Sequence, residues 1–216
     1  MNQIEIGIEP DNRNRTRIKL CGLTRPEDIE AVNEWMPDYI GFVFAKKSRR
    51  YVSGEQAAKL KNILHPGIRA VGVFVREEPE VVAGLLNERI IDLAQLHGGE
   101  DEEYIGKLRS LTDRPLIKAF RMEENPIDEI RSCTADLVLL DSGSGGTGSV
   151  FDWNLLKEVA RPYFLAGGLN VENVGEAVRI RKPFGVDVSS GIETEGVKDR
   201  EKIKQFVCAV RSAEKE

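Results

Sequence analysis

Residues 135–153 read ADLVLLDSGSGGTGSVFDW and give the clearest indication of the fold class. An apolar run of strand length ends in Asp141, and four of the six residues 143–148 are glycines. In parallel α/β proteins, ligands bind at the carboxyl ends of strands, so Asp141 lies where chemistry is expected. A glycine-rich backbone turns tightly and presents N–H groups to an anion. Glycine-rich surface loops are also common, and a strand-ending aspartate can cap a helix, so this stretch alone leaves both interpretations open.

Outward from this stretch, short apolar runs alternate with amphipathic segments along the whole chain. Strands are predicted at 17–21, 39–44, 70–75, 91–96, 115–120, 136–141, 163–166 and 185–189. Helices are predicted near 26–35, 54–63, 78–88, 101–110, 124–131, 153–160, 171–181 and 199–211. Eight strand–helix pairs within about 200 residues favour a single closed (β/α)₈ TIM barrel of parallel strands over an open doubly wound sheet.

Composition narrows the class of protein. The chain has 216 residues, 41% of them hydrophobic and 31% charged, with a formal net charge of −5. This charge argues against general binding to nucleic acid or to an anionic membrane surface. No apolar run is long enough to span a bilayer, and the N-terminus lacks a signal-like apolar core. Three widely spaced cysteines and two histidines predict neither disulfides nor a metal site, so we expect a cytoplasmic protein.

The chain is expected to form one catalytic domain. Residues 1–16 are polar and without periodicity, so they are predicted to be a flexible N-terminal extension. Residues 17–216 are predicted to form the barrel.

The first and last strands place three chemically active side chains in the barrel. Strand alternation puts Lys19 and Cys21 on one face, and Asp187 has the same inward parity on the eighth strand. Barrel closure makes these strands neighbours, so we expect Lys19 to pair with Asp187, because a buried lysine is costly unless paired. A cation near Cys21 is expected to lower the pKa of its thiol. The alternative is that Cys21 is a small buried hydrophobe.

Other strand ends carry polar groups. The loop 45–52 holds four basic residues, which would either contact an anionic substrate or form a solvated charged surface. The fourth strand ends in Gln95 and His97, which share a face, and His97 is as consistent with ligand contact as with a buried hydrogen-bonded role. Lys118 and Phe120 are expected to line the interior.

Two further glycine-containing loops follow the seventh and eighth strands, at 166–170 and 187–193. Loops at these positions are the usual phosphate site of this fold, where backbone N–H groups and a helix N-terminus meet the anion. Each motif alone is weak, but three of them on one barrel face predict a phosphate-binding site.

Together these motifs resemble the phosphoribosylanthranilate isomerase family of tryptophan biosynthesis. The similar segments are 19–24, 41–44, 48–51, 95–98, 139–141, 145–148, 151–153, 166–169 and 187–191. The resemblance runs from about Arg17 to Phe206. The sequence departs from the family pattern in its extension, at Ala45-Lys46, and at 195–197, where Pro-Gly is frequent. These departures leave partner binding open and the chemistry intact.

The resemblance implies an Amadori rearrangement by general acid–base catalysis, without metal or cofactor. It makes Asp141 the acid that opens the furanose ring, Cys21 the base that takes the C2 proton, and Arg50 the partner of the anthranilate carboxylate. His97 and Asp187 are the other expected substrate-binding residues. The expected phosphate-binding residues are Gly146, Gly148, Gly167, Gly168, Ser190 and Gly191. The expected partner is a phosphorylated sugar–anthranilate substrate, bound by a monomer or a homodimer.

Two alternatives remain at this stage. One alternative is another barrel enzyme with a phosphorylated substrate, such as indole-3-glycerol phosphate synthase or a histidine-pathway isomerase. The histidine-pathway isomerase would require aspartates at both catalytic strand ends, so Cys21 favours the anthranilate substrate. A non-catalytic phosphate sensor is the second alternative, and the presence of both Cys21 and Asp141 argues against it.

Overall fold

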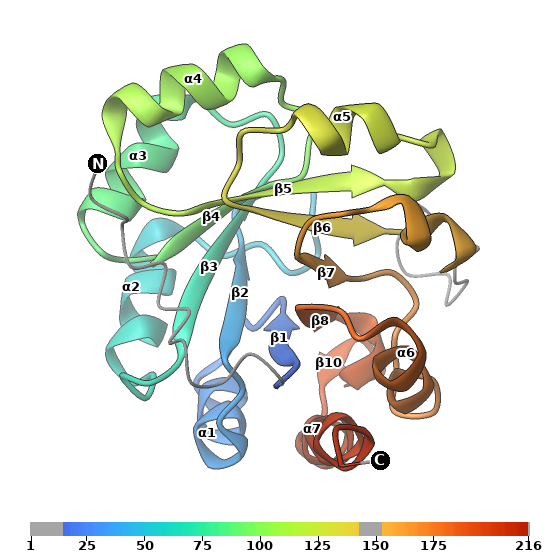
Figure 1. Cartoon of the computed structure of the whole chain (residues 1–216). Coiled ribbons are helices and arrows are strands. Elements are labelled where there is room, and N and C mark those ends of the chain that lie inside the picture. The colour runs from blue at the N-terminus through green and yellow to red at the C-terminus, as the bar shows by residue number, and fades with distance from the viewer. Residues whose placement is uncertain (1–14, 143–152, 216) are drawn as a thin grey trace.

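The computed structural model describes residues 15–142 and 153–215, which form a closed barrel of eight parallel strands in sequential order. The strands are β1 (Arg17–Cys21), β2 (Tyr39–Val43), β3 (Arg69–Phe74), β4 (Leu93–Leu96), β5 (Leu116–Arg121), β6 (Leu137–Asp141), β7 (Tyr163–Leu165) and β8 (Gly185–Val188). Helices surround this barrel (Figure 1). They are α1 (Pro26–Trp35), α2 (Gly54–Asn62), α3 (Pro79–Asn87), α4 (Glu102–Leu111), α5 (Ile127–Ser132), α6 (Val174–Arg181) and α7 (Arg200–Ala213). The predicted parallel (β/α)₈ barrel is confirmed.

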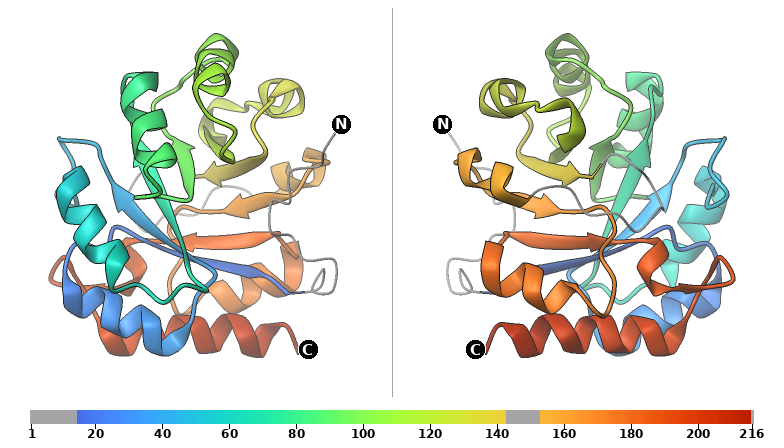
Figure 2. Two further views of the ribbon diagram at one scale, coloured as in Figure 1. Left: turned by 90° about the vertical axis from the view of Figure 1, so that its left-hand side faces the viewer. Right: turned by 90° about the vertical axis from the view of Figure 1, so that its right-hand side faces the viewer.

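Barrel closure brings the two ends of the fold together. β1 pairs with β2 on one side and with β8 on the other, and Lys19 is in register with Asp187. On the outside, α7 packs against α1 and α6, as the two side views in Figure 2 show. The first and last strand–helix units therefore lie side by side although they are far apart in sequence.

Strand alternation divides the buried apolar side chains into two groups. An inner group fills the barrel: Tyr39, Val71, Leu93, Ile117, Ala119, Leu137, Leu139, Phe164 and Ala166. A larger outer group, which includes Ile18, Leu20, Phe120 and Val138, lies between the strands and the helices. Because successive side chains of a strand point to opposite faces, strands β2 to β7 contribute apolar residues to both groups, whereas the inner group has none from β1 or β8.

Two local features differ from the sequence prediction. The segment predicted as a helix at 153–160 contains only a short 3₁₀-helix, η3 (Trp153–Glu158). After β8, where no strand was predicted, the chain forms a 3₁₀ turn, η4 (Ser190–Ile192), and a small hairpin, β9 (Glu193–Thr194) and β10 (Val197–Lys198). The hairpin turn places Glu195 and Gly196 at positive φ, 52° and 81°.

The described part of the chain starts on the barrel surface. Thr16 is buried, and its backbone N–H donates to Glu214 Oε1 at 2.6 Å. Residues 1–14, which make up most of the predicted extension, lie outside the described residues. Within the described ranges, no helix is both long and apolar enough to cross a membrane.

Candidate functional site

The carboxyl ends of all eight strands open at one end of the barrel because the strands are parallel. Cys21 is the last residue of β1 and is 7% exposed. Its neighbour in register on β2 is Gly41, where an added Cβ would lie 2.6 Å from the Cys21 Sγ atom. Glycine at position 41 therefore makes the room that the thiol occupies.

Below the thiol lies the predicted ion pair. Lys19 Nζ donates to Asp187 Oδ1 at 2.9 Å, and the Lys19 side chain is fully buried. Burial lowers the pKa of Lys19, but Asp187 and Cys21 outweigh it, so that the pKa is raised overall. The lysine is therefore charged, and the expected Lys19–Asp187 contact is confirmed.

Lys19 lowers the pKa of Cys21, as expected, but the whole environment raises it. Burial raises the pKa of the Cys21 thiol, Asp187 raises it further, and Lys19 and Lys198 only partly offset them. The physical reason is that a fully buried thiolate loses more stabilisation from water than it gains from a lysine that is already paired with Asp187. In the ligand-free protein, Cys21 is a neutral thiol at neutral pH.

Asp141 ends β6, which is separated from β1 by the two strands β7 and β8. His97 follows β4 and brings its Nε2 atom to 3.3 Å from Asp141 Oδ2. Gln95, inside the barrel on β4, places its Nε2 atom 2.9 Å from His97 Nδ1. The structure thus joins the candidate acid to two residues of the fourth strand. Sequence reasoning placed His97 near a ligand but missed its contact with Asp141.

Arg50, the expected partner of a substrate carboxylate, is held by a carboxylate of the protein. Its Nε and Nη2 atoms donate to the two oxygens of Glu193 at 2.6 and 2.8 Å. Glu193 also accepts from Lys198 at 2.7 Å and from Arg49 at 2.7 Å. Arg50 lies over Gly22, where an added Cβ would be 2.4 Å from Arg50 Cδ.

This cluster orients the arginine beside Cys21. Burial raises the pKa of Glu193, but Arg50 and Lys198 together lower it below its ordinary value, so the carboxylate is ionised and the Arg50 guanidinium is held in one geometry. Burial lowers the pKa of Lys198, whose ammonium also donates to the Ser189 carbonyl at 2.8 Å. The sequence analysis missed Glu193 and Lys198 because both residues lie on a hairpin that was not predicted.

The loops after β7 and β8 lie against each other. Gly167 and Gly168 have φ values of +83° and +67°, and a Cβ at Gly167 would approach Asp141 Oδ1 to 2.7 Å. Gly191 is packed so closely on the first loop that an added Cβ would lie 2.0 Å from the Leu169 carbonyl oxygen. Ser190 begins the 3₁₀ turn beside it. Gly146 and Gly148 lie outside the described residues.

Lys118 and Phe120 do not line the interior. Phe120 belongs to the outer apolar group, and Ile117 and Ala119 face the barrel centre instead. The prediction was off by one residue in register, and a shift of one residue exchanges the faces of a strand. Lys118 instead lies 3.8 Å from the buried carboxylate of Glu100.

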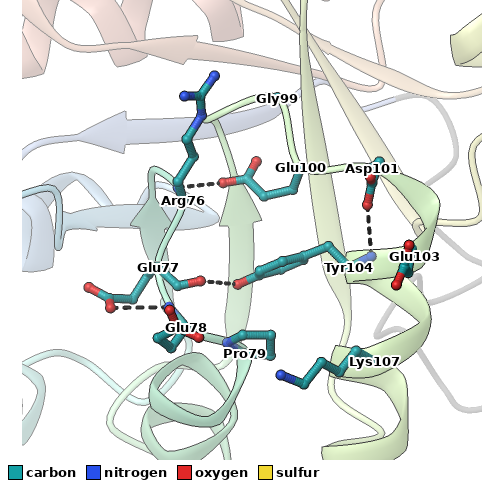
Figure 3. A pocket seen from close by; sticks show the side chains of 10 residues that line it. All are labelled: Arg76, Glu77, Glu78, Pro79, Gly99, Glu100, Asp101, Glu103, Tyr104 and Lys107. Atoms are coloured by element: carbon teal, nitrogen blue, oxygen red, sulfur yellow. Dashed lines mark hydrogen bonds between the residues drawn. The ribbon is translucent and has the colours of Figure 1, made fainter.

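A pocket of about 460 Å³ opens beside the barrel mouth, between the loops after β3 and β4 (Figure 3). Its lining residues are Arg76, Glu77, Glu78, Pro79, Gly99, Glu100, Asp101, Glu103, Tyr104 and Lys107. Their polar groups bond to one another: Tyr104 Oη donates to the Glu77 carbonyl at 2.7 Å, and Glu100 accepts from the Arg76 N–H at 2.8 Å. None of the predicted site residues lines it, so we place the functional site at the strand ends. Within the described ranges, no group of three or more His, Cys, Asp or Glu side chains is placed to hold a metal ion.

The chain is similar to known proteins of one family. Residues 18–209 match the family model described as N-(5'-phosphoribosyl)anthranilate isomerase. The chain is 46% identical over 202 residues to the N-(5'-phosphoribosyl)anthranilate isomerase of Endomicrobium trichonymphae, covering 91% of this chain and 98% of that protein.

Two solved structures of the same family are similar over 91% of this chain and 99% of theirs. One is a phosphoribosylanthranilate isomerase in complex with reduced 1-(o-carboxyphenylamino)-1-deoxyribulose 5-phosphate, with a TM-score of 0.77 and 36% identity. The other is a monomeric form generated from the dimeric enzyme of Thermotoga maritima, with a TM-score of 0.78 and 36% identity.

Proposed function

The chain belongs to the N-(5'-phosphoribosyl)anthranilate isomerase family of tryptophan biosynthesis, and from that premise we propose how its barrel mouth performs the reaction. The substrate is N-(5-phosphoribosyl)anthranilate, and the product is 1-(2-carboxyphenylamino)-1-deoxy-D-ribulose 5-phosphate. The observation that carries the proposal is the placement of a thiol and a carboxyl group, Cys21 and Asp141, at strand ends of the same barrel mouth. A fluorescence assay for the loss of phosphoribosylanthranilate tests the activity directly.

In the first step, Asp141 gives a proton to the ring oxygen of the furanose. The C1–O bond breaks, its electron pair stays on oxygen, and the anthranilate nitrogen shares its lone pair with C1 to form an iminium ion. The protonated carboxyl group must therefore stand beside the ring oxygen. General acids placed in this way commonly contribute about 10²–10⁴-fold to a rate.

In the second step, Cys21 takes the proton from C2. The C2–H electron pair forms the C1–C2 double bond of an enolamine, and the iminium nitrogen becomes neutral. The enolamine then tautomerises to the ketone, with a proton returned to C1. Because the free thiol is neutral, the thiolate has to form within the substrate complex, where the positive iminium adds to the charges of Lys19 and Lys198.

The rest of the mouth binds the two anionic ends of the substrate. The Arg50 guanidinium, oriented by Glu193, is proposed to bind the anthranilate carboxylate. His97 and Asp187 are proposed as the other substrate-binding residues. The loops that carry Gly167, Gly168, Ser190 and Gly191, with Gly146 and Gly148, are proposed to hold the phosphate through backbone N–H groups. The phosphate then contributes binding and orientation without taking part in bond making.

We further propose that residues 17–216 are one catalytic domain, that residues 1–16 lie outside the barrel, and that the enzyme works in the cytoplasm. A monomer and a homodimer both fit a site built from one chain. Sedimentation equilibrium of the full chain and of a chain lacking residues 1–14 tests the assembly and the part that the extension plays in it.

The role of Arg50 predicts a selective loss on substitution. Arg50→Ala is expected to lower kcat/KM by the equivalent of about 1.5–3 kcal/mol, the usual value of a charge-assisted hydrogen bond. Lys46→Ala and Lys47→Ala are the matched controls, because both side chains are exposed and solvated charges contribute little. Steady-state kinetics measures all three. Equal losses at the three positions would show diffuse attraction and contradict a specific contact.

The environment of Cys21 predicts how its thiol titrates. Because burial raises its pKa, the thiolate is expected to form only above the ordinary thiol value of about 8.5. Alkylation by iodoacetamide as a function of pH, read by peptide mass spectrometry, measures this midpoint, with the exposed Cys208 as a reference in the same sample. A midpoint below 8 would mean that Lys19 and Lys198 dominate over burial.

A further inference from the structure

The buried side chain of Gln95 lies next to His97, which contacts the candidate acid Asp141, and only one of its two polar atoms has a hydrogen-bond partner among the described residues. The residue is 1% exposed and points into the barrel from β4. Its Nε2 atom lies 2.9 Å from His97 Nδ1, while its Oε1 atom is buried and has no hydrogen-bond partner in the part of the chain that the structure describes. A buried carbonyl oxygen without a partner is unfavourable, so its retention calls for a physical explanation.

His97 connects this amide to Asp141. The two ring nitrogens are fully used: Nδ1 faces Gln95, and Nε2 lies 3.3 Å from Asp141 Oδ2. Whether Gln95 presents a donor or an acceptor to Nδ1 therefore determines whether Nδ1 is protonated. This in turn determines how a proton is shared between Nε2 and the Asp141 carboxyl group.

The amide can offer either of its ends. With the NH₂ group toward His97, Nδ1 accepts, the neutral ring carries its proton on Nε2, and that N–H donates to an ionised Asp141. In this arrangement the pair holds no proton that an acid could deliver. After a half-turn, Oε1 faces His97 and requires a protonated Nδ1, so that Nε2 and the Asp141 carboxyl group share one additional proton.

We propose that Gln95 is a positioning residue whose amide turns when the His97–Asp141 pair takes up the proton that Asp141 delivers. The inference rests on the proposed role of Asp141 as the acid. A protonated Nδ1 cannot face an NH₂ group, since both are donors. The unpartnered Oε1 atom is the acceptor that this state needs, and the half-turn brings it there.

The arrangement answers a problem of general-acid chemistry at neutral pH. A carboxylic acid with an ordinary pKa near 3.9 holds a proton in about one molecule in a thousand at pH 7, whereas an imidazole titrates close to neutrality. A proton shared between the two groups is available far more often. Loading takes one proton from water, and the first step of the reaction delivers one proton to the ring oxygen, so the cycle balances.

Charged side chains of the described residues lie near both ends of this chain of groups. Glu100 accepts from the backbone N–H of Gly98, the residue after His97, at 2.8 Å. The charged neighbour on β5 is Arg121, in register with Asp141, and it is exposed and lies 3.8 Å from Glu124. From β7 the neighbour is Gly167, and the backbone N–H of His97 donates to the Phe74 carbonyl of β3 at 2.8 Å. Gln95 is therefore the polar side chain placed to respond to His97 Nδ1.

The test uses nitrogen-15 NMR of the ligand-free, full-length protein between pH 5.5 and 9. The chain has only two histidines, and His65, whose Nδ1 accepts from the Gly67 N–H at 3.1 Å, is an internal control. The side-chain NH₂ signals of Gln95 are expected to shift with the same pH midpoint as the His97 ring signals. The NH₂ signals of Gln56, which donates to the Thr24 carbonyl at 2.8 Å, should stay constant. Constant Gln95 signals during the titration of His97 would overturn the proposal.

Two variants separate positioning from packing. Gln95→Glu offers only acceptors when ionised, so it is expected to move the His97 midpoint upward, whereas Gln95→Met offers none and should move it downward. Gln95→Met should also lower kcat about tenfold, less than the 10²–10⁴-fold for loss of an acid, with KM within twofold and a larger deficit at higher pH. Shifts of the midpoint in the same direction for both variants, or an unchanged kcat in Gln95→Met, would refute the proposal.

The outcomes for Gln95 and for the acid itself are distinguishable. The NMR titration needs no turnover, so it reports on the amide even if another residue is the acid. Conversely, full activity of Asp141→Asn would contradict the proposed function while the NMR titration still decides whether the amide turns. Circular dichroism of both Gln95 variants checks that the barrel is intact.

Discussion

Asp141→Asn and Cys21→Ser are each expected to lower kcat by about 10²–10⁴-fold, the range for loss of a proton-transfer group. Both replacements keep the shape of the side chain and change its proton affinity. An amide in place of Asp141 cannot protonate the ring oxygen, and a hydroxyl in place of Cys21 is a far weaker base at neutral pH. Steady-state kinetics of the pure variants measures the loss. The binding of product or inorganic phosphate is the control, because the proposed backbone cradle is unchanged.

The two variants should differ in kind. With substrate deuterated at C2, the primary isotope effect should be larger in Cys21→Ser, where removal of this proton becomes slower, than in Asp141→Asn, where ring opening is impaired. Full activity of Cys21→Ser would show that the thiol is not the base. Asp187, the carboxylate nearest to the thiol's own lysine, would then become the candidate.

The second large effect concerns the ion pair beneath the thiol. Asp187→Ala leaves the fully buried Lys19 ammonium without its partner, and breaking a buried pair from one side typically costs about 3–5 kcal/mol. We expect the free energy of unfolding, measured by urea denaturation at pH 7, to fall by this amount. Activity should fall as well, because Lys19 is one of the charges that offset the burial of Cys21.

A double-mutant cycle provides the control for this prediction. Lys19→Met combined with Asp187→Ala removes both charges, so the double variant should be more stable than Asp187→Ala alone. If the single Asp187→Ala variant unfolded at the wild-type urea midpoint, the pair would contribute nothing to stability.

Much of the barrel follows from local rules. Apolar runs of strand length alternating with amphipathic segments predict the element order, and the observed strands begin and end within about two residues of the predicted ones. Where the rules failed, the local signal was misleading. The segment 153–160 has the composition of a helix but contains only the short η3, and the hairpin at 193–198 is made of strands only two residues long, too short for a period to be read.

The site shows the same division. Strand parity together with barrel closure was enough to predict the contact between Lys19 and Asp187. An error of one residue in parity placed Lys118 inside the barrel, although it lies against Glu100 on the outside. Side chains alternate between the two faces of a strand, so an error of one residue assigns every side chain of that strand to the wrong face.

The parallel barrel, the strand ends that carry Cys21 and Asp141, and the family could all be predicted from the sequence. These features depend on hydrophobic periodicity and on motifs within single segments. The burial of the site residues and their charged or hydrogen-bonding partners became apparent only in the three-dimensional structure. Desolvation sets the sign of the pKa shift at Cys21, Glu193 holds the Arg50 guanidinium, and His97 lies between Gln95 and Asp141. Burial and charge pairing are properties of side chains brought together from distant segments, and no pattern within one segment records them.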